Sequence, residues 1–200
     1  MENHNYLINV VLVILISGVI LTLIGNYILN KFSQSNTINL KTCDEKLLEE
    51  ANSRRGNNGR NGYTLSFTGY VVTGMGLLFL IILSTFFSVD SKNTQSENIK
   101  KIISGNLPVF LSLIVVSYIL FLNVNYKERL IQGKVASDYF SYLSFFSLMF
   151  MVQIITLSKY TKSLGSNNNQ AGSVIYALAL VNILLLGVMN IILSFFSTDG

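Results

Sequence analysis

The residues best suited to acid–base or metal chemistry lie in one polar segment, residues 31–63. It carries four carboxylates: Asp44, Glu45, Glu49 and Glu50. Paired carboxylates do such chemistry when a sheltered pocket holds them together and shifts their pKa values. Here they alternate with Lys41 and Lys46 along a short amphipathic stretch, a pattern typical of a solvated helix face.

The same segment is basic, and its arginines at 54, 55 and 60 have two interpretations. Arg54, Arg55 and Arg60 are suited to contacts with phosphates of anionic lipid headgroups or nucleic acid, or with a partner protein. They equally serve to fix which side of a membrane the segment occupies. The neighbouring glycines follow no phosphate-loop order, so no nucleotide site is predicted.

Few other groups can do chemistry. The chain has one cysteine, Cys43, and one histidine, His4, so it forms neither an internal disulfide nor a cysteine or histidine metal cluster. No nucleophile and base stand at a catalytic spacing. We therefore expect a protein that is not an enzyme and that carries no cofactor and no metal.

The elements that would position these residues are long and apolar. Only 12% of the 200 residues are charged and the mean hydropathy is +0.51. Residues 6–29 contain no charge and would form a helix of roughly 36 Å, enough to cross a hydrocarbon core of about 30 Å. The predicted fold is an all-α, polytopic transmembrane helical bundle of five spans, or four if residues 139–158 lie in the interface. The five predicted spans are residues 6–29, 64–89, 106–123, 139–158 and 173–196.

The connections follow from local signals. Thr42 and Glu45 fit a capping box, which predicts a short helix over residues 43–53 inside the polar loop 31–63. The glycine- and asparagine-rich residues 54–62 are then expected to be a mobile loop. Asn106 is the predicted N-cap of the third span, with Pro108 in its first turn.

Lysine and arginine counts favour an N-terminus outside and a cytosolic C-terminus, with loop 31–63 also cytosolic. None of the predicted spans contains an ionisable side chain. Ionisable groups within a membrane usually mark proton relays and ion paths, so their absence argues against a proton-coupled pump. The polar side chains that remain within the spans are neutral hydroxyls and amides, and the amides include Asn9, Asn26, Asn123, Gln153, Asn182 and Asn190. Amides of this kind either join helices by hydrogen bonds or line a neutral pore.

Small and polar residues at helical spacing predict the faces where spans meet, because close packing and hydrogen bonds hold helices together in lipid. The second span aligns Ser66, Gly69, Thr73, Gly76 and Ser84 on one stripe. The other predicted packing residues are Gly18, Thr22 and Gly25 in the first span and Ala179, Asn182 and Asn190 in the fifth.

The final residues, Phe196 to Gly200, directly follow the last predicted span. Together with the abundance of Asn, Ile, Lys and Phe, this tail resembles small multi-span membrane proteins of giant nucleocytoplasmic DNA viruses. The resemblance implies a virion inner-membrane or capsid-anchoring protein without catalytic residues. We expect a structural or assembly subunit whose partners are the lipid bilayer and other protein subunits. The alternative is a channel or transporter subunit with a neutral pore lined by Asn and Ser.

Overall fold

The computed structural model describes residues 2–36, 45–88, 94–132, 135 and 137–162, with four further helical positions between 181 and 191. Its helices are α1 (Glu2–Asn36), α2 (Glu45–Ser88), α3 (Gln95–Asn125), α4 (Lys127–Ile131) and α5 (Ser137–Lys162). No strand occurs in this part of the chain. The predicted all-α class is confirmed.

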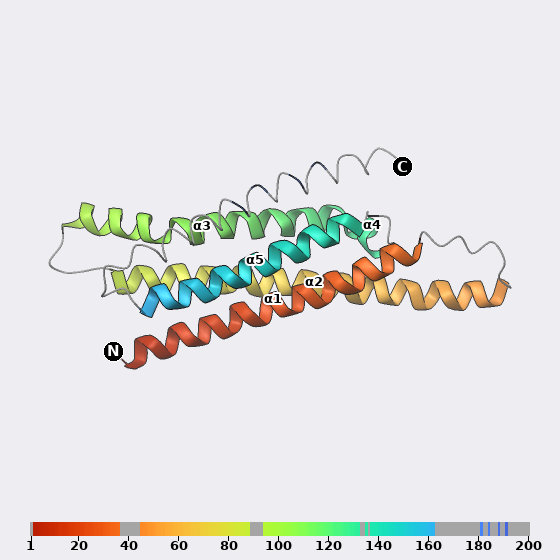
Figure 1. The fold of residues 1–200 in the computed structure, drawn as a ribbon, viewed down its shortest axis with the longest axis horizontal. Coiled ribbons are helices and arrows are strands. Elements are labelled where there is room, and N and C mark those ends of the chain that lie inside the picture. The colour runs from red at the N-terminus through yellow and green to blue at the C-terminus, as the bar shows by residue number, and fades with distance from the viewer. Residues whose placement is uncertain are drawn as a thin grey trace.

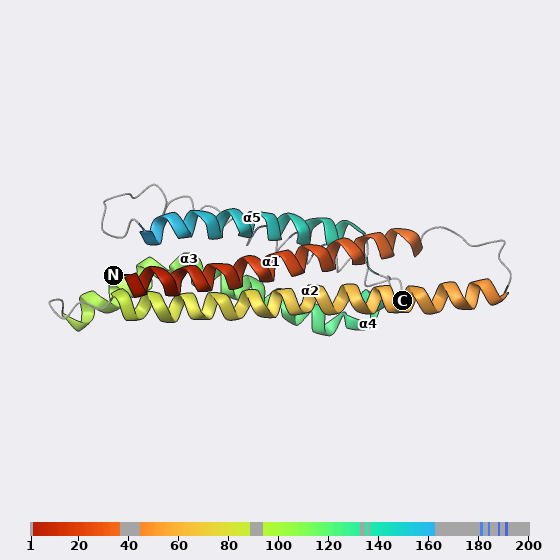
Figure 2. The same ribbon diagram turned by 90° about the horizontal axis from the view of Figure 1, so that it is seen from below.

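The four long helices lie along the long axis of an elongated bundle, and successive helices run in opposite directions (Figure 1). α1 and α2 pack against each other most extensively. α5 packs on α1 and α3 packs on α2, while the short α4 turns the chain at one end. Seen along a perpendicular direction, α5 and α2 lie on opposite sides of α1 (Figure 2).

Two helical stretches are long and apolar enough to cross a membrane, Tyr6–Ser33 and Asn57–Leu83. They contain most of the first and second predicted spans. The third predicted span lies within α3, whose apolar portion Val109–Asn125 is shorter, and the fourth lies within α5. The fifth, residues 173–196, falls outside the described residues except at four helical positions.

The predicted loop over residues 54–62 is wrong, because these residues are helical and belong to α2. The short helix predicted to end at residue 53 is instead the beginning of this 44-residue helix. The physical reason is packing: Gly59 and Gly62 are buried against neighbouring elements. Glycine weakens an isolated helix by about 1 kcal/mol, but here its missing side chain allows the neighbours to approach.

The predicted N-cap at Asn106 is also wrong, since α3 begins at Gln95. Thr94 caps the helix: its hydroxyl accepts the Glu97 amide at 3.4 Å, and the Glu97 carboxylate accepts the Thr94 amide at 2.9 Å. These hydrogen bonds, the one from the Thr94 backbone foremost, hold the pKa of Glu97 below its ordinary value of 4.5. Pro108 therefore lies inside the helix and not in its first turn.

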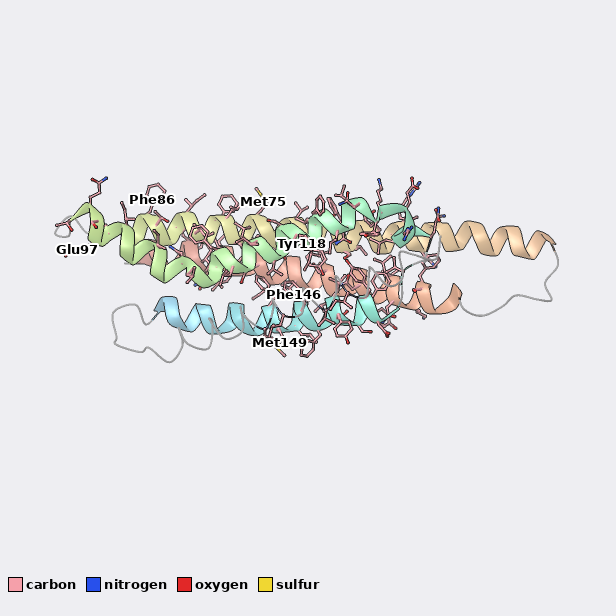
Figure 3. All side chains as sticks on the ribbon, turned by 90° about the horizontal axis from the view of Figure 1, so that it is seen from above. Met75, Phe86, Glu97, Tyr118, Phe146 and Met149 are labelled. Atoms are coloured by element: carbon pink, nitrogen blue, oxygen red, sulfur yellow. The ribbon has the colours of Figure 1, made fainter. Side chains whose placement is uncertain are left out.

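Large apolar side chains cover the outer faces of all four long helices, and polar side chains are buried among them. Met75 and Phe86 project from the outer side of α2, whereas Phe146 of α5 points inward (Figure 3). The buried polar side chains are Thr22, Asn26, Ser33, Ser66, Thr73, Asn106, Ser112, Asn123 and Ser147. The bundle is thus apolar outside and partly polar inside.

Candidate functional site

α1 and α2 cross at a series of glycines with almost no space between their backbones. A methyl group at Gly25 would overlap the backbone of Ser66, and one at Gly69 would overlap the backbone of Thr22. A Cβ at Gly18 would lie 2.5 Å from the Thr73 hydroxyl oxygen. Such contacts let two helices approach closely enough for dispersion forces to act between backbones.

The crossing continues toward both ends of the two helices. At Gly76 a Cβ would come within 2.6 Å of the Leu15 side chain, and at Gly62 it would meet Leu29 at 3.0 Å. The structure therefore places seven of the eight small residues predicted for the first two spans at one interface: Gly18, Thr22, Gly25, Ser66, Gly69, Thr73 and Gly76. The side chain of the eighth, Ser84, lies outside the described part of the structure.

Next to this interface, four buried polar side chains form a chain of hydrogen bonds. The Ser66 hydroxyl donates to the Asn26 carbonyl oxygen at 2.7 Å, and the Asn26 amide donates to the Tyr70 hydroxyl at 3.4 Å. Tyr70 is in turn hydrogen-bonded to the Ser147 side chain. Because Ser147 donates its own proton to the Leu143 carbonyl at 2.9 Å, its oxygen accepts the Tyr70 proton. This polar network connects α1, α2 and α5.

The network is sealed from solvent. Asn26 and Ser66 have no exposed surface, and Tyr70 is only 1% exposed. On the α5 side, the polar network is followed by aromatic side chains. Tyr139 and Phe140 meet edge to face, and Phe146 stacks on Phe150. An amide or hydroxyl without a partner in such surroundings would be costly, so the paired network favours this one helix arrangement.

The arrangement holds helices together and is poorly suited to chemistry. All four side chains are neutral, and none is a general base or a strong nucleophile. The Asn26 amide accepts through oxygen and donates through nitrogen, so it cannot pass a proton along the chain as a hydroxyl or carboxyl can. Among the residues that the structure describes, no group of His, Cys, Asp and Glu could hold a metal.

The three predicted arginines belong to α2 but are not part of this interface. Arg60 is exposed on α2, and Arg54 and Arg55 belong to the same helix nearer its start. Ala179, Asn182 and Asn190 lie outside the described residues, so their predicted packing role stays a prediction.

Sequence reasoning missed Tyr70 and Ser147. A signal for Tyr70 was present, because it follows Ser66 by four residues and so lies on the same face of α2. Ser147 carries no such signal, since its role depends on how α5 packs in three dimensions.

Comparison with protein-family models, curated proteins and solved structures gives no match to this chain. Its function is therefore inferred from the arrangement of its own residues.

Gly69→Ala should destabilise the bundle while Gly74→Ala should not. Both glycines are buried on α2, but a Cβ at Gly74 meets only Val116 at an ordinary 3.7 Å. We expect a loss of about 1–3 kcal/mol for Gly69→Ala from overpacking, and a change between zero and a gain of about 1 kcal/mol for Gly74→Ala. Unfolding by increasing SDS in mixed micelles measures both. Equal stability of the two variants would contradict the close crossing.

Tyr70→Phe and Asn26→Leu should be coupled, because each removes one partner from the same polar network. A double-mutant cycle on unfolding free energies should give a coupling of about 0.6–1.7 kcal/mol, the range seen for hydrogen bonds between membrane helices. Tyr142→Phe is the matched control, since Tyr142 is 36% exposed on α5. Strict additivity of Tyr70→Phe with Asn26→Leu would rule out the network as a stabilising unit.

Proposed function

We propose that the chain is a multi-pass integral membrane protein that acts as a non-catalytic structural or assembly subunit of a larger membrane complex. The observation that supports this proposal is that apolar side chains cover the outside of the bundle while polar side chains are buried inside it, the reverse of a soluble protein. Side chains such as Val13, Ile114 and Phe121 are 58–66% exposed, while Asn26, Ser66 and Ser147 are buried. A soluble protein rarely exposes apolar surface over all its long helices, whereas a bilayer covers such a surface.

In this proposal five spans cross the membrane: α1, α2, α3, α5 and residues 173–196. The outer faces of α3 and α5 support their inclusion, since Ile114, Phe121 and Leu148 are at least half exposed. The four described positions of the last segment, Val181, Leu184, Val188 and Ile191, are helical and exposed. They recur every three or four residues, which is the spacing of one helix face.

The proposed orientation places the N-terminus outside and the connection between α1 and α2 in the cytosol. Because successive long helices run in opposite directions, the end of α1, the start of α2 and α4 lie at the same end of the bundle. Seven of the described cations belong to the helix ends there, against four at the opposite end, and cationic residues are in excess on cytosolic loops. The seven are Lys31, Lys46, Arg54, Arg55, Arg60, Lys127 and Arg129, and the four are Lys100, Lys101, Lys159 and Lys162.

The natural single cysteine tests the orientation directly. Cys43 should react with a membrane-impermeant maleimide in inside-out vesicles and should be protected in intact cells. Cells permeabilised before labelling provide the control for general reactivity. Labelling of Cys43 in intact cells would show that the orientation is the reverse of the one proposed, and it would leave the proposed number of spans unchanged.

α2 offers a surface for a partner because it continues beyond its neighbour. The α1–α2 contacts keep one register, in which Phe32 meets Gly59. Extending that register brings the last residue of α1, Asn36, level with Arg55. The first residues of α2, about ten of them, therefore project past α1 by roughly 15 Å (Figure 1). We define Glu45 to Arg54 as the α2 arm and propose that it meets a partner subunit outside the membrane.

Extraction from the native membrane in a mild detergent should yield a complex of fixed composition that contains unrelated proteins. Its mass should exceed that of a small oligomer of the 22.3 kDa chain. Arg54→Glu combined with Arg55→Glu, at the boundary of the α2 arm, should release the partners while the unfolding curve stays unchanged. Asn9→Leu, an exposed position in α1, is the control that should retain them.

A small homo-oligomer without other proteins would overturn the subunit proposal. The alternative, a neutral pore, would then be tested by flux measurements on reconstituted protein. Asn26 and Asn123 are sealed within the chain, where Asn123 donates to the Ile119 carbonyl at 2.9 Å. These two amides do not line a pore within one chain, and the alternative takes its pore from several copies. Partners that belong to a virion would identify the complex as an inner-membrane or capsid-anchoring assembly.

A further inference from the structure

One end of the bundle gathers cationic side chains from three helices within about one helical turn of one another along its axis. Phe32 of α1 contacts Gly59 of α2, and each step along α1 corresponds to an equal step back along α2. The preceding residue Lys31 is therefore level with the following residue Arg60. Both side chains are exposed.

α4 contributes further cations at this end of the bundle, where it contacts α2 at the same glycine, Gly59, that Phe32 of α1 meets. The carbonyl group of Ile131 packs against Gly59, and the Lys127 ammonium lies 5.9 Å from the centre of the Tyr63 ring. α4 thus runs antiparallel to this part of α2, which places Arg129 close to the level of Arg60. The distance from Lys127 to Tyr63 is within the range of a cation–π interaction.

Tyrosines lie one turn nearer the centre of the bundle than Lys31 and Arg60, and Lys127 lies at the level of one of them, Tyr63. Tyr27 precedes Lys31 by four residues on α1 and is 67% exposed. Tyr63 follows Arg60 by three residues on α2, and its ring stacks on Phe67. A cation followed inward by an exposed tyrosine, as in Lys31 and Tyr27, is the order in which these residues meet a bilayer, from the headgroups to the edge of the hydrocarbon. Tyr63 is only 8% exposed and contacts Lys127 from within the bundle.

The position of the cations along the bundle axis favours a lipid headgroup over a soluble anion as their ligand. Lys31 lies inside the apolar stretch Tyr6–Ser33, and Arg60 lies inside Asn57–Leu83, each within a few residues of the end. In a membrane these positions fall at the headgroups. Among the side chains that the structure describes near these cations, the exposed acidic ones are Glu128 and Asp138. They are fewer than the four cations, so the level retains net positive charge.

We propose that Lys31, Arg60 and Lys127 form a binding site for the phosphate of an anionic phospholipid headgroup. The exposed Tyr27 lies against the glycerol and upper acyl carbons of this lipid, and the buried Tyr63 lies beneath Lys127. Lys127 is held in place by the Tyr63 ring, and Arg60 is placed beside it by the packing of Gly59 on α4. This inference rests on the proposed insertion into a membrane. It adds to that proposal a preferred class of lipid and the residues that select it.

The test measures lipid association with the full-length chain reconstituted in phosphatidylcholine vesicles. Spin-labelled phosphatidylglycerol and spin-labelled phosphatidylcholine report the two association constants by electron paramagnetic resonance. The wild type should prefer phosphatidylglycerol. Arg60→Gln and Lys127→Gln should each lower that preference about fivefold, the equivalent of about 1 kcal/mol for one charge at a membrane surface.

Two further variants separate a local site from general charge. Lys101→Gln removes a cation from α3 near the opposite end of the bundle and should leave the preference unchanged. Tyr63→Leu keeps every charge but removes the ring beneath Lys127, and should also lower the preference. Inorganic phosphate at millimolar concentration should not displace the labelled lipid if the site recognises a headgroup at membrane depth.

Each outcome has a distinct meaning. A chain that does not float with the vesicles overturns the proposed membrane function and this site with it. Flotation without a preference for phosphatidylglycerol overturns only the site. An equal loss for Lys101→Gln and Lys127→Gln would overturn the local site, because the preference would then come from general surface charge. Displacement by inorganic phosphate would overturn the lipid as the ligand, because the site would then bind a soluble anion.

Discussion

The close approach of α1 and α2 is the contact on which the rest of the bundle depends. Gly18, Gly25 and Gly69 bring two backbones together where any side chain would overlap the partner helix. α5 then packs on α1 and α3 packs on α2, so both outer helices take their positions from this central pair. The polar network joins α5 to the same pair through Tyr70 and Ser147. Loss of the α1–α2 crossing would therefore also displace α3 and α5, which pack on this pair.

The polar interior follows from the same constraint. Between helices with apolar exteriors, burial of hydrocarbon alone does not select one arrangement, because the outer and inner faces are similarly apolar. Paired groups such as Asn26 and Ser66 do select one, since any rotation of a helix would leave an amide or hydroxyl unpaired. Neutral amides and hydroxyls achieve this without the cost of a buried charge.

Much of the architecture was predictable because long uncharged apolar stretches and stripes of small residues are local patterns. The helical class and the face of α2 carrying Ser66, Gly69 and Thr73 could be derived from spacing alone. The helical state of residues 54–62 could not, since glycines and asparagines favour a loop until a neighbour is known to need the space. The cap at Thr94 was visible as a Thr-x-x-Glu motif, but Asn106 followed by Pro108 offered a competing signal that the packed helix overrides.

The glycines that join α1 and α2 also determine where charges lie along the bundle axis. A slip of one helical turn would shift one helix by about 5.4 Å and would place side chains with a Cβ where Gly25 and Gly69 now stand. Because that slip is sterically excluded, Lys31 stays level with Arg60, and Gly59 keeps α4 and its cations beside them. For the proposed membrane setting, headgroup-level charge is thus a consequence of backbone packing deep in the bundle. Substitutions that loosen the crossing should accordingly disturb lipid contacts far from the altered residue.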